Sequence, residues 1–349
     1  MTLSPPGVAS TVGVKPFPRF EPFPGLSGGH AQTIVGRYLP GPRIEIPEVR
    51  VVVEVPEGEG DRLALIDSQP PQWRVGDPAA VLIHGLAGCA NSPYVARVAA
   101  KLVQAGVRTV RVNLRGAGGG FGLAKGFYHA GRTSDPRLAM LWLAEQAPNS
   151  PIALVGFSLG ANLALKLAAE AADCPVPMLD CVLAANPPLD LEACCRYLQR
   201  PGGRIYDRNF VALLHAEVRK LEAAFPELGR TDLRKAQTLF DFDDVYTAPK
   251  NGFRDALHYY ATSSAGPLLE RIGVPGLVVH AEDDPFIPVK PFRSARFPSQ
   301  LALELMPKGG HLGYFSRTRL GDDRRWLDAR FTSWLLERWG LNRGGRLVV

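Results

Sequence analysis

Short apolar runs alternate with stretches of helical periodicity through most of this 349-residue chain. The runs are short enough to be buried strands, whereas the stretches between them repeat apolar positions every three or four residues, as helices do. The predicted strands cover residues 79–83, 107–112, 152–155, 179–185, 276–280 and 302–306, and the predicted helices cover 93–105, 135–147, 159–171 and 323–339. This alternation predicts an α/β fold with a mostly parallel central sheet and helices on both faces.

The first part of the chain departs from this alternation. Six prolines within the first 25 residues exclude a helix or a central strand there, so this segment is expected to lie extended on the domain. Residues 1–48 together are predicted as a proline-rich N-terminal arm. Residues 49–55 and 62–67 then read as two strands, with turn signals at 56–61, and predict a β-hairpin.

Composition and charge narrow the class of protein. The length and the apolar content of 46% suit one large α/β domain with an insertion, or two small domains. The net charge of +6 is spread along the chain without a basic stripe, which argues against a nucleic-acid partner.

The cysteine spacing and the hydrophobicity pattern indicate in which cellular compartment the protein is expected. The five cysteines match no zinc spacing and are predicted to be small apolar side chains in a reducing compartment. Without a secretory signal or an apolar run of about 18 residues, the chain is expected to be cytoplasmic and to lack a membrane span. Contact with a membrane surface stays open.

The most specific motif is Gly156-Phe157-Ser158-Leu159-Gly160, which lies between the strand at 152–155 and the helix at 159–171. A serine on so tight a strand-to-helix turn is the nucleophile elbow of an α/β-hydrolase. The turn strains the serine backbone and leaves no room for side chains at the two flanking glycines. We therefore predict that Ser158 is a nucleophile.

A serine hydroxyl needs a base that a carboxylate orients, and in this fold the three residues follow in the order Ser, Asp or Glu, His. His311 lies in a glycine-flanked loop after the last predicted strand and is the predicted base. Asp283 and Asp284 both follow the strand at 276–280. Pro288 completes an Asp-x-x-hydrophobic-Pro pattern with Asp284, which is favoured as the acid over Asp283.

Acyl transfer also needs backbone donors for the developing oxyanion. The residue after the nucleophile, Leu159, is expected to supply one N–H group. The loop His84-Gly85-Leu86-Ala87-Gly88 follows the strand at 79–83, and its Leu86 N–H is the second candidate. A plain tight turn is the alternative interpretation of this loop.

The long interruption at residues 187–267 contains helical stretches at 207–225, 231–239 and 253–262 and many charged residues. Since α/β-hydrolases commonly carry a cap at this point of the chain, we expect a helical lid over the active site. The predicted organisation is then the arm followed by one α/β-hydrolase domain over residues 49–349 with this cap insertion.

Several other residues receive structural interpretations. The glycine-rich loop at 116–120 is not a phosphate loop, because no Gly-Lys-Ser/Thr sequence follows it. His215 and His258 are expected to be surface or packing residues of the cap, and His280 a hydrogen-bonded core histidine. No metal, nucleotide or other cofactor is expected.

The chain resembles the YheT-like, embryogenesis-associated branch of the α/β-hydrolases. The resemblance covers about residues 28–315. The stretches that carry it are His30-Ala31-Gln32-Thr33-Ile34, His84-Gly85-Leu86-Ala87-Gly88, Ser92-Pro93-Tyr94, Asn113-Leu114-Arg115-Gly116, Tyr128-His129-Ala130-Gly131, Gly156 to Gly160 with Ala161-Asn162-Leu163, Asp241-Phe242-Asp243-Asp244, Thr247-Ala248-Pro249, Gly252-Phe253, Asp283-Asp284-Pro285-Phe286 and Gly309-Gly310-His311.

The resemblance implies an α/β-hydrolase fold with Ser158, Asp284 and His311 as the catalytic triad. Members of this branch are described as carboxylesterases, phospholipase-like lipid hydrolases and acyltransferases that make medium-chain esters. One departure is that Gly28-Gly29 stand where the family usually has Asn-Pro.

Three further parts of these motifs have no role that the sequence can assign. For His30, His129 and the segment 241–244, a structural role in holding the arm, the glycine loop and the cap is favoured over catalysis.

The expected function is a serine hydrolase that cleaves carboxylic esters, with an apolar or medium-chain acyl group. Acyl transfer to an alcohol would use the same residues and is the alternative. A non-catalytic binding protein is less favoured because all three triad residues are present. A haloalkane dehalogenase would need Asp in place of Ser158, and no feature supports a peptidase. The acyl chain length, the leaving alcohol and the oligomeric state are not determined by these patterns.

Overall fold

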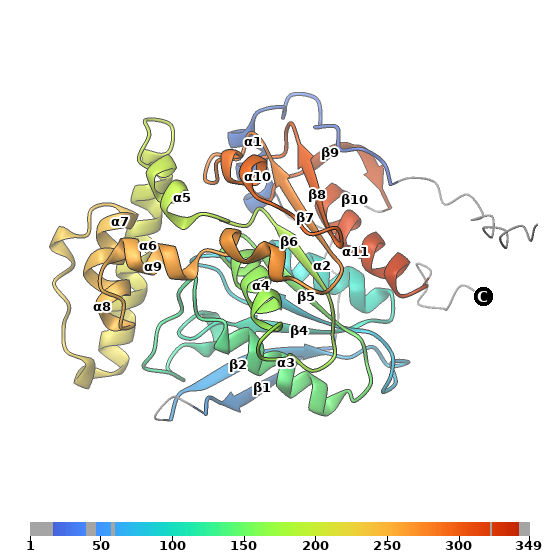
Figure 1. The fold of residues 1–349 in the computed structure, drawn as a ribbon, viewed down its shortest axis with the longest axis horizontal. Helices are drawn as coiled ribbons and strands as arrows, with labels where there is room; N and C mark the ends of the chain where they lie inside the picture. The colour runs from blue at the N-terminus through green and yellow to red at the C-terminus, as the bar shows by residue number, and fades with distance from the viewer. Residues whose placement is uncertain (1–16, 40–46, 57–59, 322, 342–349) are drawn as a thin grey trace, which may run out of the picture.

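The centre of the protein is an eight-stranded sheet with the strand order β1-β2-β4-β3-β5-β6-β7-β8 (Figure 1). The computed structural model describes residues 17–39, 47–56, 60–321 and 323–341. The strands are β1 (Val49–Glu54), β2 (Arg62–Ser68), β3 (Ala79–Ile83), β4 (Arg108–Asn113), β5 (Ile152–Phe157), β6 (Leu179–Ala185), β7 (Gly276–Ala281) and β8 (Leu301–Met306). Strand β2 runs antiparallel to both β1 and β4, and the strands from β4 to β8 are parallel. The mostly parallel sheet and the early hairpin are confirmed; the middle of its turn, 57–59, lies outside the described residues.

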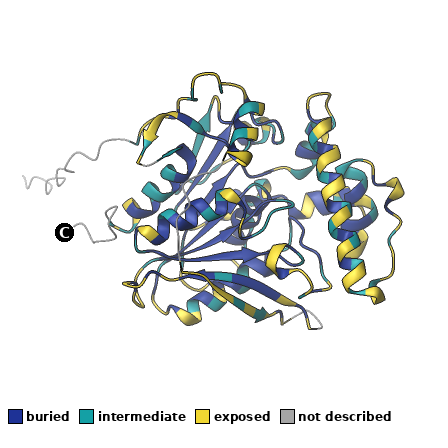
Figure 2. Ribbon diagram, turned by 180° about the vertical axis from the view of Figure 1, so that it is seen from behind, coloured by how far each residue is buried: buried dark blue, intermediate teal, exposed yellow. Residues whose placement is uncertain are grey.

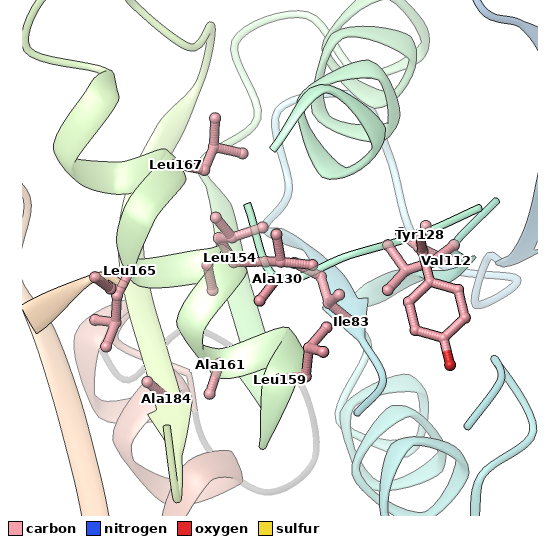
Figure 3. Packing of buried hydrophobic residues seen from close by; sticks show 14 of the residues in the cluster. Ile83, Val112, Tyr128, Ala130, Leu154, Leu159, Ala161, Leu165, Leu167 and Ala184 are labelled. Carbon is pink, nitrogen blue, oxygen red and sulfur yellow. The ribbon is translucent and has the colours of Figure 1, made fainter. Parts of the chain in front are cut away.

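Helices cover both faces of this sheet. Helices α2 (Pro93–Gln104) and α11 (Trp326–Arg338) pack together on one face, and α3 (Ser134–Gln146) and α4 (Leu159–Glu170) lie on the other. Because successive side chains of a strand point to opposite faces, neighbours such as Val81 and Leu82 enter different core clusters, and both are fully buried. Figure 3 shows the cluster that contains Leu154 of β5 together with Ala161 and Leu165 of α4.

The chain between β6 and β7 forms a helical cap beside the sheet (Figure 1, left). It contains α5 (Leu191–Leu198), α6 (Arg204–Ala224), α7 (Leu239–Phe242), α8 (Ala248–Lys250) and α9 (Ala256–Ser263). The long helix α6 buries Val211, Leu214, Val218 and Leu221, which recur at helical spacing and form one apolar face. Figure 2 shows exposed residues along the outer side of these cap helices, whereas most of the sheet is buried.

Two predicted helices differ from the structure. Residues 231–239 hold only a 3-10 turn at Leu233–Lys235, because Thr238 and Asp241 form a capping box that begins α7 at Leu239 instead. The last helix begins at Trp326 rather than at 323, since Asp323–Arg325 is a short strand (β10) paired with β9 (Phe315–Leu320).

The N-terminal arm is partly described. Residues 1–16 and 40–46 of the predicted arm lie outside the described residues. The arm runs along β9, where Phe23 N–H donates to the Phe315 carbonyl over 2.9 Å. It then forms α1 (Gly29–Tyr38), a helix that the sequence pattern did not predict.

Candidate active site

Ser158 lies on the tight turn between β5 and α4. Its φ of 55° and ψ of −123° are strained for a residue with a side chain, as the motif predicts. A Cβ atom at Gly156 would overlap the carbonyl oxygen of Gly160, and one at Gly160 would overlap the carbonyl oxygen of His84. Both glycines are therefore required for the turn, which presents the serine side chain beyond the end of β5.

A chain of hydrogen bonds connects the three predicted triad residues. Nε2 of His311 lies 2.9 Å from Oγ of Ser158, and Nδ1 of His311 lies 2.8 Å from Oδ2 of Asp284. Asp284 is buried, which opposes ionisation of its carboxyl group. The neighbouring His311, together with His280 and the backbone N–H of Phe286, nevertheless lowers the pKa of Asp284. The carboxylate is thus held in its charged form against the imidazole.

Of the two competing aspartates, it is Asp284 that contacts His311. Asp283 instead accepts a hydrogen bond from Gly310 N–H over 2.9 Å and so supports the backbone of the His311 loop. Asn186, which follows β6, donates its amide to Oδ2 of Asp284 over 2.7 Å and to the Gly310 carbonyl over 3.2 Å. The sequence reasoning did not include Asn186, which has no motif of its own.

Leu86 lies in the loop after β3 between two residues whose backbone N–H groups are hydrogen-bonded to tyrosine hydroxyls. Gly85 N–H donates to the hydroxyl of Tyr94 over 3.1 Å, and Ala87 N–H donates to the hydroxyl of Tyr128 over 2.8 Å. Between them, the N–H group of Leu86 has no acceptor within the described part of the chain, and neither has the N–H group of Leu159 at the start of α4. These are the two donors that the sequence predicts for an oxyanion.

The histidine of this loop is a structural element. Nε2 of His84 accepts from Leu114 N–H over 3.2 Å, so its proton is on Nδ1, which donates to the Gly85 carbonyl over 2.8 Å. Burial lowers the pKa of His84 to about 4, which keeps the ring neutral near pH 7. The loop is therefore held by three side chains, of which sequence reasoning had given no role to Tyr94 and Tyr128.

Helix α1 supports the loop that carries His311. The hydroxyl of Thr33 accepts from His311 N–H over 2.8 Å and donates to the Gly29 carbonyl over 2.7 Å. The amide of Gln32 accepts from Phe315 N–H over 2.7 Å and donates back to the Phe315 carbonyl over 3.1 Å. A Cβ atom at Gly29 would overlap the Asp283 carbonyl, which gives a physical reason for glycine at this position.

The remaining motif residues hold parts of the fold together. His30 stacks on Tyr206 of α6, with 5.6 Å between ring centroids, and Nδ1 of His30 lies 2.8 Å from the Tyr206 hydroxyl. His129 packs edge-on against Phe253 and Tyr259, and burial lowers its pKa to about 3. None of these residues hydrogen-bonds to the Ser158–His311–Asp284 chain.

The acidic segment at 241–244 has structural contacts of the same kind. Asp243 accepts hydrogen bonds of 2.7 Å each from the hydroxyls of Thr247 and Tyr260, and Asp244 accepts one from Ala256 N–H over 3.0 Å. With Asp241 in the capping box, the segment fastens the cap helices to one another.

One prediction about the core is wrong in part. His280 is fully buried and stacks on Phe292 at 3.8 Å between centroids, but neither of its ring nitrogens has a hydrogen-bond partner among the residues described. Burial lowers the pKa of His280 to about 4, so the ring is neutral near pH 7.

Two cavities meet the site. A cavity of about 350 Å³ reaches Ser158 and His311 and lies between α1 and α6. A smaller cavity of about 100 Å³ lies under the cap and shares Leu86, Phe210 and Phe286 with the first. Its other apolar lining residues include Leu159, Leu191, Leu198, Leu214 and Phe242. Both are concave and mostly apolar, as ligand sites usually are.

The described residues offer little else that could bind a cofactor or cross a membrane. Within those ranges no group of three or more His, Cys, Asp or Glu side chains could hold a metal ion. The same part of the chain contains no helix that is long and apolar enough to span a membrane. All five cysteines are free, and Cys181, Cys194 and Cys195 are buried.

Comparison with known proteins identifies the family. Residues 78–318 match the family model described as alpha/beta hydrolase fold. The chain belongs to the α/β-hydrolase family. This α/β-hydrolase is 34% identical over 321 residues to YheT of Escherichia coli (strain K12), which covers 90% of this chain and 92% of YheT. The YheT-like branch predicted from the motifs is thereby confirmed.

Other relatives of this α/β-hydrolase are named as enzymes of ester chemistry. Monoacylglycerol lipase of Saccharomyces cerevisiae is 28% identical over 71% of this chain and 57% of its own length. Medium-chain fatty acid ethyl ester synthase/esterase 2 of the same yeast is 26% identical over 75% of this chain and 63% of its own length. Among solved structures, the Pyrococcus furiosus esterase Pf2001 is 15% identical, covers 86% of this chain and 97% of its own, and superposes with a TM-score of 0.55, which shows the shared fold.

Proposed function

We propose that this α/β-hydrolase cleaves carboxylic esters through an acyl-enzyme formed on Ser158. The observation that carries the proposal is the unbroken hydrogen-bond chain from Oγ of Ser158 through His311 to the carboxylate of Asp284, at 2.9 and 2.8 Å. A serine with a base in reach, itself oriented by a carboxylate, is the arrangement that activates a hydroxyl as a nucleophile.

The mechanism follows from the positions of these atoms. Nε2 of His311 takes the proton of Ser158 as Oγ attacks the ester carbonyl, and Asp284 stabilises the resulting imidazolium. His311 then gives that proton to the leaving alcohol as the carbonyl re-forms. A water molecule, deprotonated by the same nitrogen, attacks the acyl-enzyme, and the proton returns to Ser158 when the acid leaves.

The unpartnered N–H groups of Leu86 and Leu159 are the proposed donors to the oxyanion. Removing one such donor typically lowers the rate about 100- to 1,000-fold. Both groups belong to residues that also line the smaller cavity under the cap. An acyl chain that extends from the oxyanion position would therefore enter apolar surroundings, which supports an apolar, medium-chain acyl group as the substrate class.

Acyl transfer to an alcohol is the second candidate. The name of the yeast relative, ethyl ester synthase/esterase, favours it. Transfer would use the same residues and would differ only in whether an alcohol or water attacks the acyl-enzyme. Adding ethanol and measuring ethyl ester against free acid distinguishes the two.

The proposal is tested by labelling with a fluorophosphonate probe beside turnover of p-nitrophenyl esters from acetate to palmitate. Ser158→Ala should lose labelling and lower turnover by roughly 10⁴- to 10⁶-fold. Ser27→Ala, an exposed serine of the arm, is the control and should behave as wild type. We expect the best ester to have an intermediate chain length. Full esterase activity in the Ser158 variant would refute the mechanism.

A further inference from the structure

Large apolar side chains remain exposed around the mouth of the larger cavity. Ile34 and Tyr38 of α1 are 50% and 72% exposed, and Ile205 and Leu213 of α6 are 73% and 36% exposed. All four line the cavity that reaches Ser158. Exposed apolar groups gathered in this way mark a surface that meets another apolar phase or a partner.

The two helices that carry these side chains are joined to each other. The ring of His30 on α1 stacks on Tyr206 of α6, and the two side chains are also within hydrogen-bond distance. Ile205 stands next to Tyr206 at the start of α6, and Ile34 lies one turn beyond His30. The two helices thus form opposite sides of one opening. We name this surface, made by Ile34, Arg37, Tyr38, Ile205 and Leu213, the mouth face.

The mouth face carries one charged side chain, which is basic. Arg37 is exposed and forms no ion pair with a carboxylate in the described part of the protein. Helix α1 contains no acidic residue. The acidic residue in the first turn of α6, Asp207, is buried and accepts a hydrogen bond from Leu239 N–H over 3.0 Å. An exposed apolar rim with a basic and no acidic side chain suits an anionic lipid layer.

We propose that the mouth face docks on an anionic lipid surface. Ile34, Tyr38 and Ile205 would enter the apolar edge of the layer, and Arg37 would contact headgroup phosphates. A lipid layer fits this surface better than a protein partner, because a protein seated there would cover the opening of the cavity. A lipid layer instead supplies an apolar ester at that opening. The role of the surface in delivering substrate rests on the proposed function, whereas the docking itself requires no turnover.

Docking is measured by co-sedimentation of the Ser158→Ala protein with vesicles. Vesicles of phosphatidylcholine and phosphatidylglycerol should bind the protein, and vesicles of phosphatidylcholine alone should bind it much less. High salt should weaken the binding, since the contact of Arg37 with the headgroups is exposed to solvent and therefore screened. The use of the inactive variant separates docking from hydrolysis of the vesicle lipids.

Two variants and two matched controls assign the binding to the mouth face. Ile205→Glu and Arg37→Glu should each lower the bound-to-free ratio about tenfold or more. Leu257→Glu, at a leucine of α9 that is 44% exposed, and Arg230→Glu, at an exposed arginine of the cap, make the same changes elsewhere and should leave binding near wild type. Circular dichroism and thermal unfolding check that each variant folds.

The outcomes are separable from those of the esterase test. Absence of binding to anionic vesicles, or binding that the mouth-face variants share equally with the controls, would overturn the docking proposal. Either result could occur while wild-type Ser158 still labels with the fluorophosphonate probe. Conversely, vesicle binding without labelling would support docking and overturn the proposed hydrolysis.

Discussion

Two tyrosine hydroxyls hold the backbone on either side of Leu86. Because Tyr94 engages Gly85 N–H and Tyr128 engages Ala87 N–H, the intervening N–H group of Leu86 is the one left for a ligand. The Tyr128 hydroxyl also donates to Glu217 of α6 over 3.3 Å, which links the loop to the cap. These tyrosines therefore position a proposed catalytic donor through their hydrogen bonds to the loop backbone.

Replacing Tyr128 with Phe removes the acceptor for Ala87 N–H and frees the loop to turn. Since a misplaced oxyanion donor weakens transition-state binding, we expect kcat to fall about 10- to 100-fold with little change in KM. The matched control is Tyr259→Phe, whose hydroxyl accepts from Ala130 N–H over 2.9 Å, outside this loop. Steady-state kinetics and urea unfolding of both variants are the measurements. Equal losses of kcat in the two would show that Tyr128 is merely structural.

At the level of single residues, what sequence could predict depended on local context. Ser158 was predictable because its strained turn needs glycines at fixed positions, and Asp284 and His311 because both follow strand ends in a fixed order. The roles of Tyr128 and Asn186 could not be predicted, because each contacts a loop that is distant in the sequence and adjacent only after folding.

Helix α1 acts as a support for the loop that carries the proposed base. It is short and contains two glycines, Gly29 and Gly36, which pack directly on the backbone of Asp283 and Gly313. Such a helix has low intrinsic stability, and its contacts with the rest of the protein hold it in place. Its position rather than its own chemistry thus sets the orientation of His311.

Thr33→Val tests this support. The change keeps the shape of the side chain but removes the acceptor for His311 N–H, so the loop should lose its alignment while the fold persists. We expect kcat to fall about tenfold and the free energy of unfolding by about 1 kcal/mol. Thr33→Ser, which restores the hydroxyl, should recover activity. The control is Thr332→Val in α11, whose hydroxyl donates within its own helix; wild-type kcat in Thr33→Val would contradict the role given to α1.

The elements that the sequence did and did not predict differ in what stabilises them. The parallel strands were predicted because burial on both faces makes them continuous apolar runs. Helix α1 and the hairpin of β9 and β10 were not predicted, because tertiary contacts rather than an apolar pattern of their own determine them. Residues 231–239 have the composition of an amphipathic helix, which is why the sequence predicts one there. The cap at Thr238 instead begins a new helix at Leu239 and leaves only the 3-10 turn at Leu233–Lys235.

The stability of the whole molecule depends on pH through buried carboxyl groups in the cap. Burial raises the pKa of Asp243 from 3.8 to about 7 and that of Glu217 from 4.5 to about 7. Between about pH 4 and pH 7 the folded state therefore holds protons that the unfolded chain has released. Raising the pH through this range favours the unfolded state, so both groups make the protein less stable at pH 8 than at pH 5.

Asp243→Asn should reduce the loss of stability between pH 5 and pH 8. An amide at residue 243 can still accept from the Thr247 hydroxyl but cannot ionise, so the folded protein no longer holds a buried charge at high pH. We expect a smaller decrease in the free energy of unfolding from pH 5 to pH 8 than in wild type, measured by urea unfolding at several pH values. Asp244→Asn, in the adjacent position, is the control. A decrease as large as that of wild type would refute the assignment.

The position of His311 between α1 and β9 determines when the proposed active site is completed during synthesis of the chain. The strand that presents Ser158 is translated well before β9, yet the backbone around His311 is hydrogen-bonded to α1 and depends on the segment that ends at Phe315. A chain still emerging from the ribosome could therefore build most of its sheet while its proposed base has no fixed place. Ester turnover would begin only when segments from opposite ends of the sequence close on one another, so the appearance of activity would report the last step of maturation rather than the first.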